Sequence, residues 1–291
     1  MRPVPELPEV ETMRRGVLHA VGGRIASVDR PPCAKRPLAI HPGWDEFHRR
    51  VEGRSIVEIG RLGKRVIFKL DDEMRVVFEP RMTGLVLVAQ PPTVEHLRLR
   101  LTLAGVAEPE ILFWDRRGLG VLHALDPHEF AQQLGPHKLG PDALEITFDE
   151  LRAKFKKVSR PVKVALLDQQ LLAGVGNLYA AEILHVARIH PERPTDRLTT
   201  AEVESIHAAM QAVLNEAIRY EGSTLSDGTY RNALNQDGGY QNQHRVYDKA
   251  GATCRVCTTT EIVRIVQAQR STFYCPTCQP KRPAAARKRV K

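Results

Sequence analysis

The stretch Leu97-Arg-Leu-Arg-Leu-Thr-Leu103 alternates apolar and polar side chains along its whole length. Because successive side chains of a β-strand point to opposite faces, this pattern predicts a strand with one buried and one solvated face. Other short runs with a period of two surround it, separated by turn residues: 55–59, 66–70, 75–79, 85–89, 111–114 and 119–123. So many short strands at this spacing predict a β-sandwich.

A helix is predicted on the N-terminal side of these strands. Its apolar residues recur at helical spacing after Pro8: Val10, Met13, Val17, Leu18 and Val21. The pair Gly22-Gly23 ends the pattern, as glycine commonly does at a helix C-terminus. We expect this helix to pack on the sandwich.

Helical patterns take over beyond a Gly/Pro-rich break at 134–141. Thr147-x-x-Glu150 and Thr199-x-x-Glu202 have the form of capping boxes, which open helices. Between them, two helical stretches within 165–182 meet at the turn Gly174-Val-Gly-Asn177. Backbone N–H groups at such a turn can hold an anion, although many Gly-rich turns serve only chain geometry. Residues 222–251 are predicted to form a long loop.

Four cysteines near the C-terminus have the spacing of a zinc site. Cys254-x2-Cys257 and Cys275-x2-Cys278 each place two thiolates in one tight turn, and the segments 262–266 and 271–274 between them have strand composition. Four thiolates leave no open position for a substrate. The sequence therefore predicts one structural Zn²⁺ held by a hairpin.

Composition narrows the class of protein. The 291 residues carry a formal charge of +9, but six of these charges lie in the tail 281–291. This tail is expected to be disordered. It would either act as a solubilising end or contact DNA loosely. No apolar run reaches the about 18 residues of a membrane span. Glu6, Glu9 and Glu11 stand where a secretory signal would be basic and then apolar, so a cytoplasmic protein is expected.

Several motifs together resemble one family. The opening Pro5-Glu-Leu-Pro-Glu-Val-Glu-Thr12, the Gly63-Lys64 turn, the helix pair 163–182 and the segment Gln269-Arg-Ser-Thr-Phe-Tyr-Cys-Pro-Thr-Cys-Gln279 are similar, in this order, to the motifs of the formamidopyrimidine-DNA glycosylase family (Fpg, also called MutM). The resemblance implies a multi-domain α+β fold. Its expected parts are an N-terminal β-sandwich with a helix (1–130), a helical helix-two-turns-helix domain (141–245), a four-cysteine zinc finger hairpin (246–280) and the basic tail.

The resemblance also implies an activity. Such an enzyme is a bifunctional DNA glycosylase and AP lyase of base excision repair, both a hydrolase and a lyase. It would flip oxidised purines, 8-oxoguanine or formamidopyrimidines, out of double-stranded DNA, and cut the strand at the abasic site by β,δ-elimination. We expect a monomer without a membrane partner, bound to the bacterial nucleoid through DNA.

The family's catalytic residues can be carried over to matching positions. Pro5 would supply the nucleophilic amine, Glu6 the acid that assists opening of the sugar ring, and Glu9 a supporting carboxylate. Lys64 and Arg270 look like cations that grip the phosphates of the flipped nucleotide. From the residues alone, Glu6 and Glu9 would be ordinary first-turn acids, and Lys64 would lie in a solvated turn.

Six further positions match the family's DNA-binding residues: Met82, His96, Arg117, Leu119, Lys163 and Asn177. Met82 and Arg117 would fill the gap that the flipped base leaves. From the residues alone, Met82 would be a buried packing residue and Arg117 an exposed charge in a turn. Asn177 resembles a phosphate ligand and Lys163 a residue near the damaged base. Leu119 stands where the family has a wedging Phe, so damage search or opposite-base preference is expected to differ.

The four residues Met1-Arg-Pro-Val4 precede the expected nucleophile. A peptide-bonded Pro5 nitrogen is an amide with no lone pair to donate, so we expect synthesis in the cell to begin at position 4, from a GUG codon, and Pro5 to be exposed by an aminopeptidase. Two other hypotheses are an endonuclease VIII-like enzyme for oxidised pyrimidines and a non-catalytic DNA-binding paralogue. The segment 222–227 resembles the base-capping loop of the oxidised-purine branch and favours that branch.

Overall fold

The computed structural model describes residues 5–225 and 228–281. These residues form two compact units. We call residues 5–139 with 215–242 the sandwich unit, and residues 140–214 with 243–281 the zinc unit. The four-part division expected from the sequence stays a prediction. The expectations about residues 1–4, and about the tail beyond Lys281, concern positions outside the described residues.

Two sheets make up the sandwich unit. The four-stranded sheet is antiparallel, in the order β1 (Arg24–Asp29), β7 (Leu97–Ala104), β8 (Glu110–Asp115), β6 (Gly84–Leu87). The five-stranded sheet has the order β2 (Ala39–His41), β9 (Val121–Leu125), β5 (Arg75–Glu79), β4 (Arg65–Leu70), β3 (Ile56–Leu62). Only the β2–β9 pair among these strands is parallel.

The core lies between the two sheets. Phe78 of the five-stranded sheet packs against Phe113 of the four-stranded sheet with ring centroids 5.7 Å apart, and against Phe68 at 5.1 Å. All three rings are fully buried. Tilted aromatic pairs of this kind bury a large apolar area and favour one geometry, so they fix how the sheets face each other.

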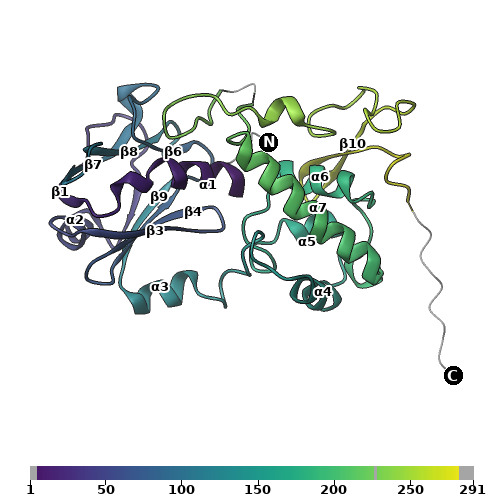
Figure 1. The fold of residues 1–291 in the computed structure, drawn as a ribbon, viewed down its shortest axis with the longest axis horizontal. Helices are drawn as coiled ribbons and strands as arrows, with labels where there is room; N and C mark the ends of the chain where they lie inside the picture. Colours follow the sequence, from purple (N-terminus) through teal and green to yellow (C-terminus); the bar gives the residue numbers. More distant parts are fainter. Residues whose placement is uncertain (1–4, 226–227, 282–291) are drawn as a thin grey trace. The chain divides into compact units, whose positions relative to one another are not determined.

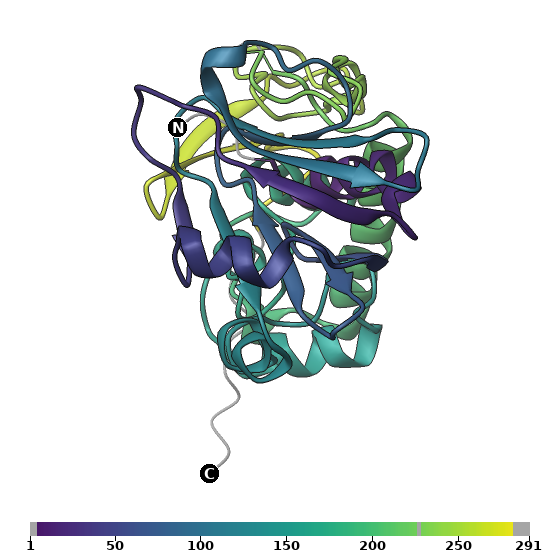
Figure 2. The same ribbon diagram turned by 90° about the vertical axis from the view of Figure 1, so that its left-hand side faces the viewer.

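Helices cover both open sides of the sandwich. Helix α1 (Leu7–Gly16) contacts β6 at one edge of the four-stranded sheet and β3 and β4 at one edge of the other (Figure 1). Helix α2 (Trp44–Val51) contacts β1 and β2 at the opposite edges, on the side that Figure 2 turns to the viewer. Each helix buries its apolar stripe there, because the sandwich edges leave apolar side chains uncovered.

The sandwich unit also contains elements that the sequence did not predict. They are β1, β2, α2 and α3 (Pro127–Leu134). The first helix is shorter than expected: α1 ends at Gly16, and the turn η1 (Leu18–Ala20) follows. Such 3₁₀ turns are common where helices end.

The zinc unit is mainly helical. Its helices are α4 (Phe148–Lys156), α5 (Val162–Leu166), α6 (Asn177–Val186) and most of α7 (Thr200–Arg219), with the turn η3 (Thr195–Arg197). Both predicted capping boxes form: Thr147 Oγ1 accepts from Glu150 N at 3.3 Å, and Thr199 Oγ1 accepts from Glu202 N at 3.2 Å. The hairpin of β10 (Val263–Gln267) and β11 (Arg270–Tyr274) packs on α6.

The predicted loop after α7 contains one short turn, η4 (Tyr240–Gln243). In the described part of the chain, no helix has the length and apolar character needed to cross a membrane.

Candidate nucleic-acid site

The start of α1 carries the expected catalytic residues Pro5 and Glu6. Glu6 is only 5% exposed, and its backbone N–H donates to Glu9 Oε2 at 2.9 Å. The other oxygen of Glu9, Oε1, accepts from the backbone N–H of Ser223 at 2.9 Å. One carboxylate therefore joins the residue next to Pro5 to the loop that follows α7.

This loop is held closely against α1. A Cβ on Gly222 would lie 2.8 Å from Glu9 Oε1, and Gly222 has φ +78°, so glycine is required there. A Cβ on Gly16 would lie only 2.2 Å from Cβ of Ala233. The base-capping loop expected from the sequence is thus anchored on the helix that carries Pro5 at its start, and 226–227 are its two undescribed residues.

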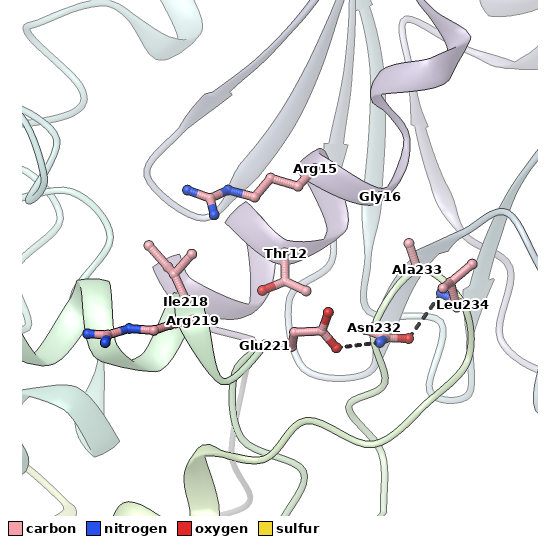
Figure 3. A pocket seen from close by; sticks show the side chains of 9 residues that line it. All are labelled: Thr12, Arg15, Gly16, Ile218, Arg219, Glu221, Asn232, Ala233 and Leu234. Carbon is pink, nitrogen blue, oxygen red and sulfur yellow. Dashed lines mark hydrogen bonds between the residues drawn. The ribbon is translucent and has the colours of Figure 1, made fainter.

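A cavity of about 440 Å³ lies between the C-terminal half of α1 and this loop (Figure 3). Its lining residues are Thr12, Arg15, Gly16, Ile218, Arg219, Glu221, Asn232, Ala233 and Leu234. Asn232 donates to Glu221 Oε2 at 2.7 Å and accepts from Leu234 N at 3.0 Å. None of the predicted site residues lines this cavity.

Two turns of the sandwich unit bring Met82 and Arg117 together. Arg117 is exposed, and its Nη1 lies 3.2 Å from Sδ of the half-buried Met82. Thr83 Oγ1 hydrogen-bonds Asp115 Oδ1, and Arg117 N donates to both of these oxygens at 3.1 Å. The turns that carry the two predicted void-filling residues are therefore tied to each other.

Asp115 organises this pair of turns, although no motif in the sequence singles it out. Its side chain is fully buried, and its Oδ2 accepts from Gly120 N at 2.7 Å. The half-buried Leu119 lies in the same turn. In the sequence it is one acidic residue at the end of a strand, so only its burial and its hydrogen bonds reveal its role.

Lys64 and His96 lie elsewhere in the sandwich unit. Lys64 occupies the turn between β3 and β4, directly after Gly63 with φ +57°. His96 ends the short turn η2 (Val94–His96) before β7. It is 8% exposed, and its ring packs edge-on against Trp114 with centroids 5.6 Å apart. These two predicted residues are therefore carried by separate turns of the sandwich unit.

Lys163 and Asn177 meet in the zinc unit. Lys163 is 1% exposed, and its ammonium donates to Asn177 Oδ1 at 2.6 Å, Thr272 Oγ1 at 2.7 Å and Ser271 O at 2.9 Å. Asn177 also donates from Nδ2 to Ser271 O at 3.1 Å. The two residues thus fasten α5 and α6 to the hairpin, whereas their predicted contacts with DNA stay predictions.

Arg270 is presented by the hairpin turn. Ala268 and Gln269 both have positive φ, 45° and 60°, as a two-residue type I′ turn requires, and Arg270 follows as the first residue of β11. Gln279 fixes the other end of the hairpin: it donates to Ile189 O at 2.9 Å and accepts from Cys275 N at 3.1 Å.

The four predicted metal ligands come together at the base of this hairpin. All four Sγ atoms lie within 4.8 Å of one another. The pairs Cys254–Cys278 and Cys257–Cys275 are 3.8 and 3.7 Å apart. Tetrahedral zinc with Zn–S bonds of about 2.3 Å separates its sulfurs by about 3.8 Å, so the cluster fits one structural zinc ion.

The thiols of the cluster differ in how readily they lose the proton that a metal would replace. Hydrogen bonding from the Thr259 backbone lowers the pKa of Cys257 to about 5, whereas burial raises that of Cys278 to about 12. A coordinated thiol is deprotonated outright, so zinc would reverse the direction at Cys278. The fifth cysteine, Cys33, lies in the sandwich unit, where its Sγ donates to Glu95 O at 3.1 Å.

Three family models match the chain, one after another. They describe the formamidopyrimidine-DNA glycosylase N-terminal domain (residues 4–122), the formamidopyrimidine-DNA glycosylase H2TH domain (139–229) and the zinc finger found in FPG and IleRS (251–281). Their order follows the three structural parts expected from the sequence.

Whole-chain relatives agree with these matches. The chain is 39% identical to the formamidopyrimidine-DNA glycosylase of Chloroflexus aurantiacus, over 95% of this chain and 98% of the relative. It is also 37% identical to that of Thermus thermophilus, over 96% of this chain and the full relative.

Solved structures agree as well. The crystal structure of the MutM (Fpg) protein from Thermus thermophilus matches with a TM-score of 0.81 at 36% identity, over 96% of this chain and all of that one. The complex of Lactococcus lactis Fpg with DNA containing an abasic site matches with a TM-score of 0.81 at 32% identity, over 95% and 100%. With this identity, coverage and cysteine cluster, the chain belongs to the formamidopyrimidine-DNA glycosylase family.

Proposed function

We propose that this protein excises oxidised purines from double-stranded DNA and then cleaves the strand at the resulting abasic site. The observation that carries the proposal is the Pro5-Glu6 start of α1, joined through the Glu9 carboxylate to the loop at Ser223. Family membership and relatives named formamidopyrimidine-DNA glycosylases support the same activity. The solved complex of Lactococcus lactis Fpg with abasic-site DNA supports DNA as the partner.

The Pro5 amine is the proposed nucleophile. An α-amino group has a pKa of about 8, so a useful fraction is unprotonated near neutral pH. Its lone pair attacks C1′ of the flipped nucleotide, and the C1′–N bond to the damaged base breaks. The C1′–O4′ bond of the sugar ring then breaks, O4′ takes up a proton, and the amine becomes an iminium at C1′. The iminium acidifies the 2′ proton, and loss of that proton expels the 3′ phosphate; loss of a second proton, from C4′, then expels the 5′ phosphate.

Glu6 and Glu9 have separate tasks in this scheme. Glu6 would donate a proton to the ring oxygen as the sugar opens. Glu9 uses both oxygens to accept backbone hydrogen bonds, from Glu6 and from Ser223. It therefore positions the catalytic residues and the loop instead of transferring protons.

The remaining predicted residues act on the DNA. Lys64 and Arg270 would hold phosphates, with Asn177 as a further ligand. Removing a base from the stack costs a few kcal/mol, and the adjacent Met82 and Arg117 side chains would occupy the space it leaves.

The test is borohydride trapping on duplex DNA containing 8-oxoguanine. Borohydride reduces the iminium, so a covalent protein–DNA product reports an amine bound to C1′, which in this scheme is the Pro5 amine. A chain whose first residue is Pro5 should be trapped. A matched chain with one glycine before Pro5, and the chain beginning at Met1, should not be trapped if their N-termini are verified by mass spectrometry. Equal trapping of all three would contradict Pro5 as the nucleophile, and binding without trapping by any would favour a non-catalytic DNA-binding protein.

A further inference from the structure

Glu79 is a buried carboxylate close to the Met82 turn. It is the last residue of β5, and its side chain is 7% exposed. It forms ion pairs with Arg65 and with Arg81, whose Nε lies 2.8 Å from Oε2. Burying a carboxylate is costly unless cations and hydrogen bonds compensate it, so these two arginines are what hold the charge in place.

His123 also faces this carboxylate, with Nε2 3.8 Å from Glu79 Oε1. Burial lowers the pKa of His123 to about 4, so this imidazole is neutral near pH 7. Its neighbour His41 stacks on it with ring centroids 5.2 Å apart. The cations paired with Glu79 at neutral pH are therefore Arg65 on β4 and Arg81 in the turn.

Arg81 has an unusual backbone conformation. Its φ is +53°, in the left-handed region that residues with a Cβ disfavour. The turn around it is fixed at both ends: Gly84 N donates to Pro80 O at 2.8 Å, and a Cβ on Gly84 would lie 2.6 Å from that oxygen. A change of Arg81 to negative φ would relieve this strain, and the ion pair with Glu79 opposes that change.

Met82 lies between two anchored residues. Arg81 before it is held by Glu79, and Thr83 after it is held by Asp115. The Arg81 side chain is itself 56% exposed, so the Glu79 contact constrains a residue that solvent would otherwise leave free to move. A shift of Arg81 towards negative φ would turn the next peptide and carry Met82 away from Arg117.

We propose that Glu79 is a positioning residue for Met82 and acts by holding Arg81 in the left-handed conformation. The inference rests on the proposed function, because it assumes that Met82 enters the space left by a flipped base. Glu79 touches neither DNA nor the reacting atoms in this scheme.

The first test compares two substitutions at one position. Arg81→Ala and Arg81→Gly both remove the guanidinium and any contact it makes with DNA, but only glycine adopts positive φ without strain. With Pro5 as the first residue, Arg81→Gly should excise 8-oxoguanine in single turnover at a rate close to that of its Arg81 parent. Arg81→Ala should be slower by about tenfold, equivalent to ~1.4 kcal/mol.

A second readout separates positioning from general damage to the protein. In duplexes with 2-aminopurine next to the lesion, the rise in fluorescence reports unstacking before any bond breaks. Arg81→Ala should slow this rise by the same factor as excision, with the duplex Kd changed less than twofold. Equal rates for the alanine and glycine variants would overturn the proposal.

Rescue provides the third test. Glu79→Gln should slow unstacking, because a neutral amide holds Arg81 less strongly, and adding Arg81→Gly should restore the rate, because glycine needs no anchor. A double variant as slow as Glu79→Gln would show that Glu79 acts in another way. If the Pro5-first parent excises nothing, the proposed function fails whatever the variants do. If the parent excises and the rescue fails, only this inference fails.

Discussion

Lys163 donates a hydrogen bond of 2.6 Å from its ammonium to the side-chain oxygen of Asn177, the first residue of α6. The same ammonium reaches Ser271 and Thr272 on β11, so one buried charge connects two helices with the hairpin. A buried lysine is tolerated when its donors are satisfied, as they are here. The residue that the family resemblance places near the damaged base therefore also joins the parts of the zinc unit.

Lys163→Met should destabilise the zinc unit. The substitution leaves the buried acceptor on Thr272 and the partly buried acceptor on Asn177 without their donor, at a cost of about 1–3 kcal/mol. We expect faster loss of zinc to a chelator and weaker DNA binding. Lys157→Met, at an exposed position, is the matched control and should match the wild type in both measurements. Unchanged zinc retention in Lys163→Met would show that the three hydrogen bonds contribute little.

Cys275→Ser should release zinc and abolish most DNA affinity, because structural zinc supplies folding free energy at its site. Zinc content and duplex binding are the measurements. Both tryptophans, Trp44 and Trp114, lie in the sandwich unit, so their fluorescence should still report a folded sandwich. Cys33→Ser should keep both zinc and affinity. Full DNA affinity in a zinc-free Cys275→Ser protein would contradict the prediction.

Arg117→Ala should slow excision by roughly tenfold or more, since a guanidinium contact with a base contributes about 1–3 kcal/mol. The excision rate, measured opposite each of the four bases, should fall while the dependence of binding on salt stays the same. Wild-type rates opposite all four would show that Arg117 does not contact the unpaired base.

Lys64→Ala should change binding in a different way. Loss of one phosphate contact should reduce the slope of log K against log salt concentration by about 1 and weaken binding to damaged and undamaged duplexes alike. Titrations at several salt concentrations measure this slope. A slope equal to that of the wild type would place Lys64 away from the phosphates.

Acid should destabilise the sandwich unit through His123. The pKa of this residue falls from 6.5 to about 4 because burial penalises the charged ring. Between these values the unfolded chain binds more protons, so the contribution of His123 to stability is complete above pH 6.5 and is lost as the pH falls towards 4. Urea unfolding followed by tryptophan fluorescence at about pH 7 and about pH 5 measures the loss, and His123→Gln should reduce the difference. An equal difference in both proteins would assign the acid sensitivity to other groups.

Much of the fold could be predicted because its signals are local. The alternation in 97–103 identified β7, and the Thr147 and Thr199 capping boxes located the starts of two helices. Helix α3 also has a local signal, because Asp126 and Glu129 form a capping box and Pro127 stands in the first turn. By contrast, β2 is three residues long and pairs in parallel with β9, a contact that no local pattern encodes.

The candidate site was predictable only in part, for a related reason. The spacing of the four cysteines identifies the metal ligands, and the motif around Pro5 and Glu6 identifies those two residues. The roles of Asp115 and Glu79 depend on burial and on partners brought close by strand pairing, and in sequence each is an ordinary acidic residue at the end of a strand.

The four-sulfur cluster is sensitive to oxidation, and oxidation also produces the oxidised purines that are the proposed substrate. Two pairs of its sulfurs lie 3.7 and 3.8 Å apart, so an oxidant that takes two electrons from one pair needs little movement to form a disulfide. That reaction would expel the zinc ion and release the hairpin that presents Arg270. Oxidising conditions would thus create lesions in DNA and at the same time weaken the binding of the protein to them. A cellular thiol reductant and a new zinc ion would restore the cluster.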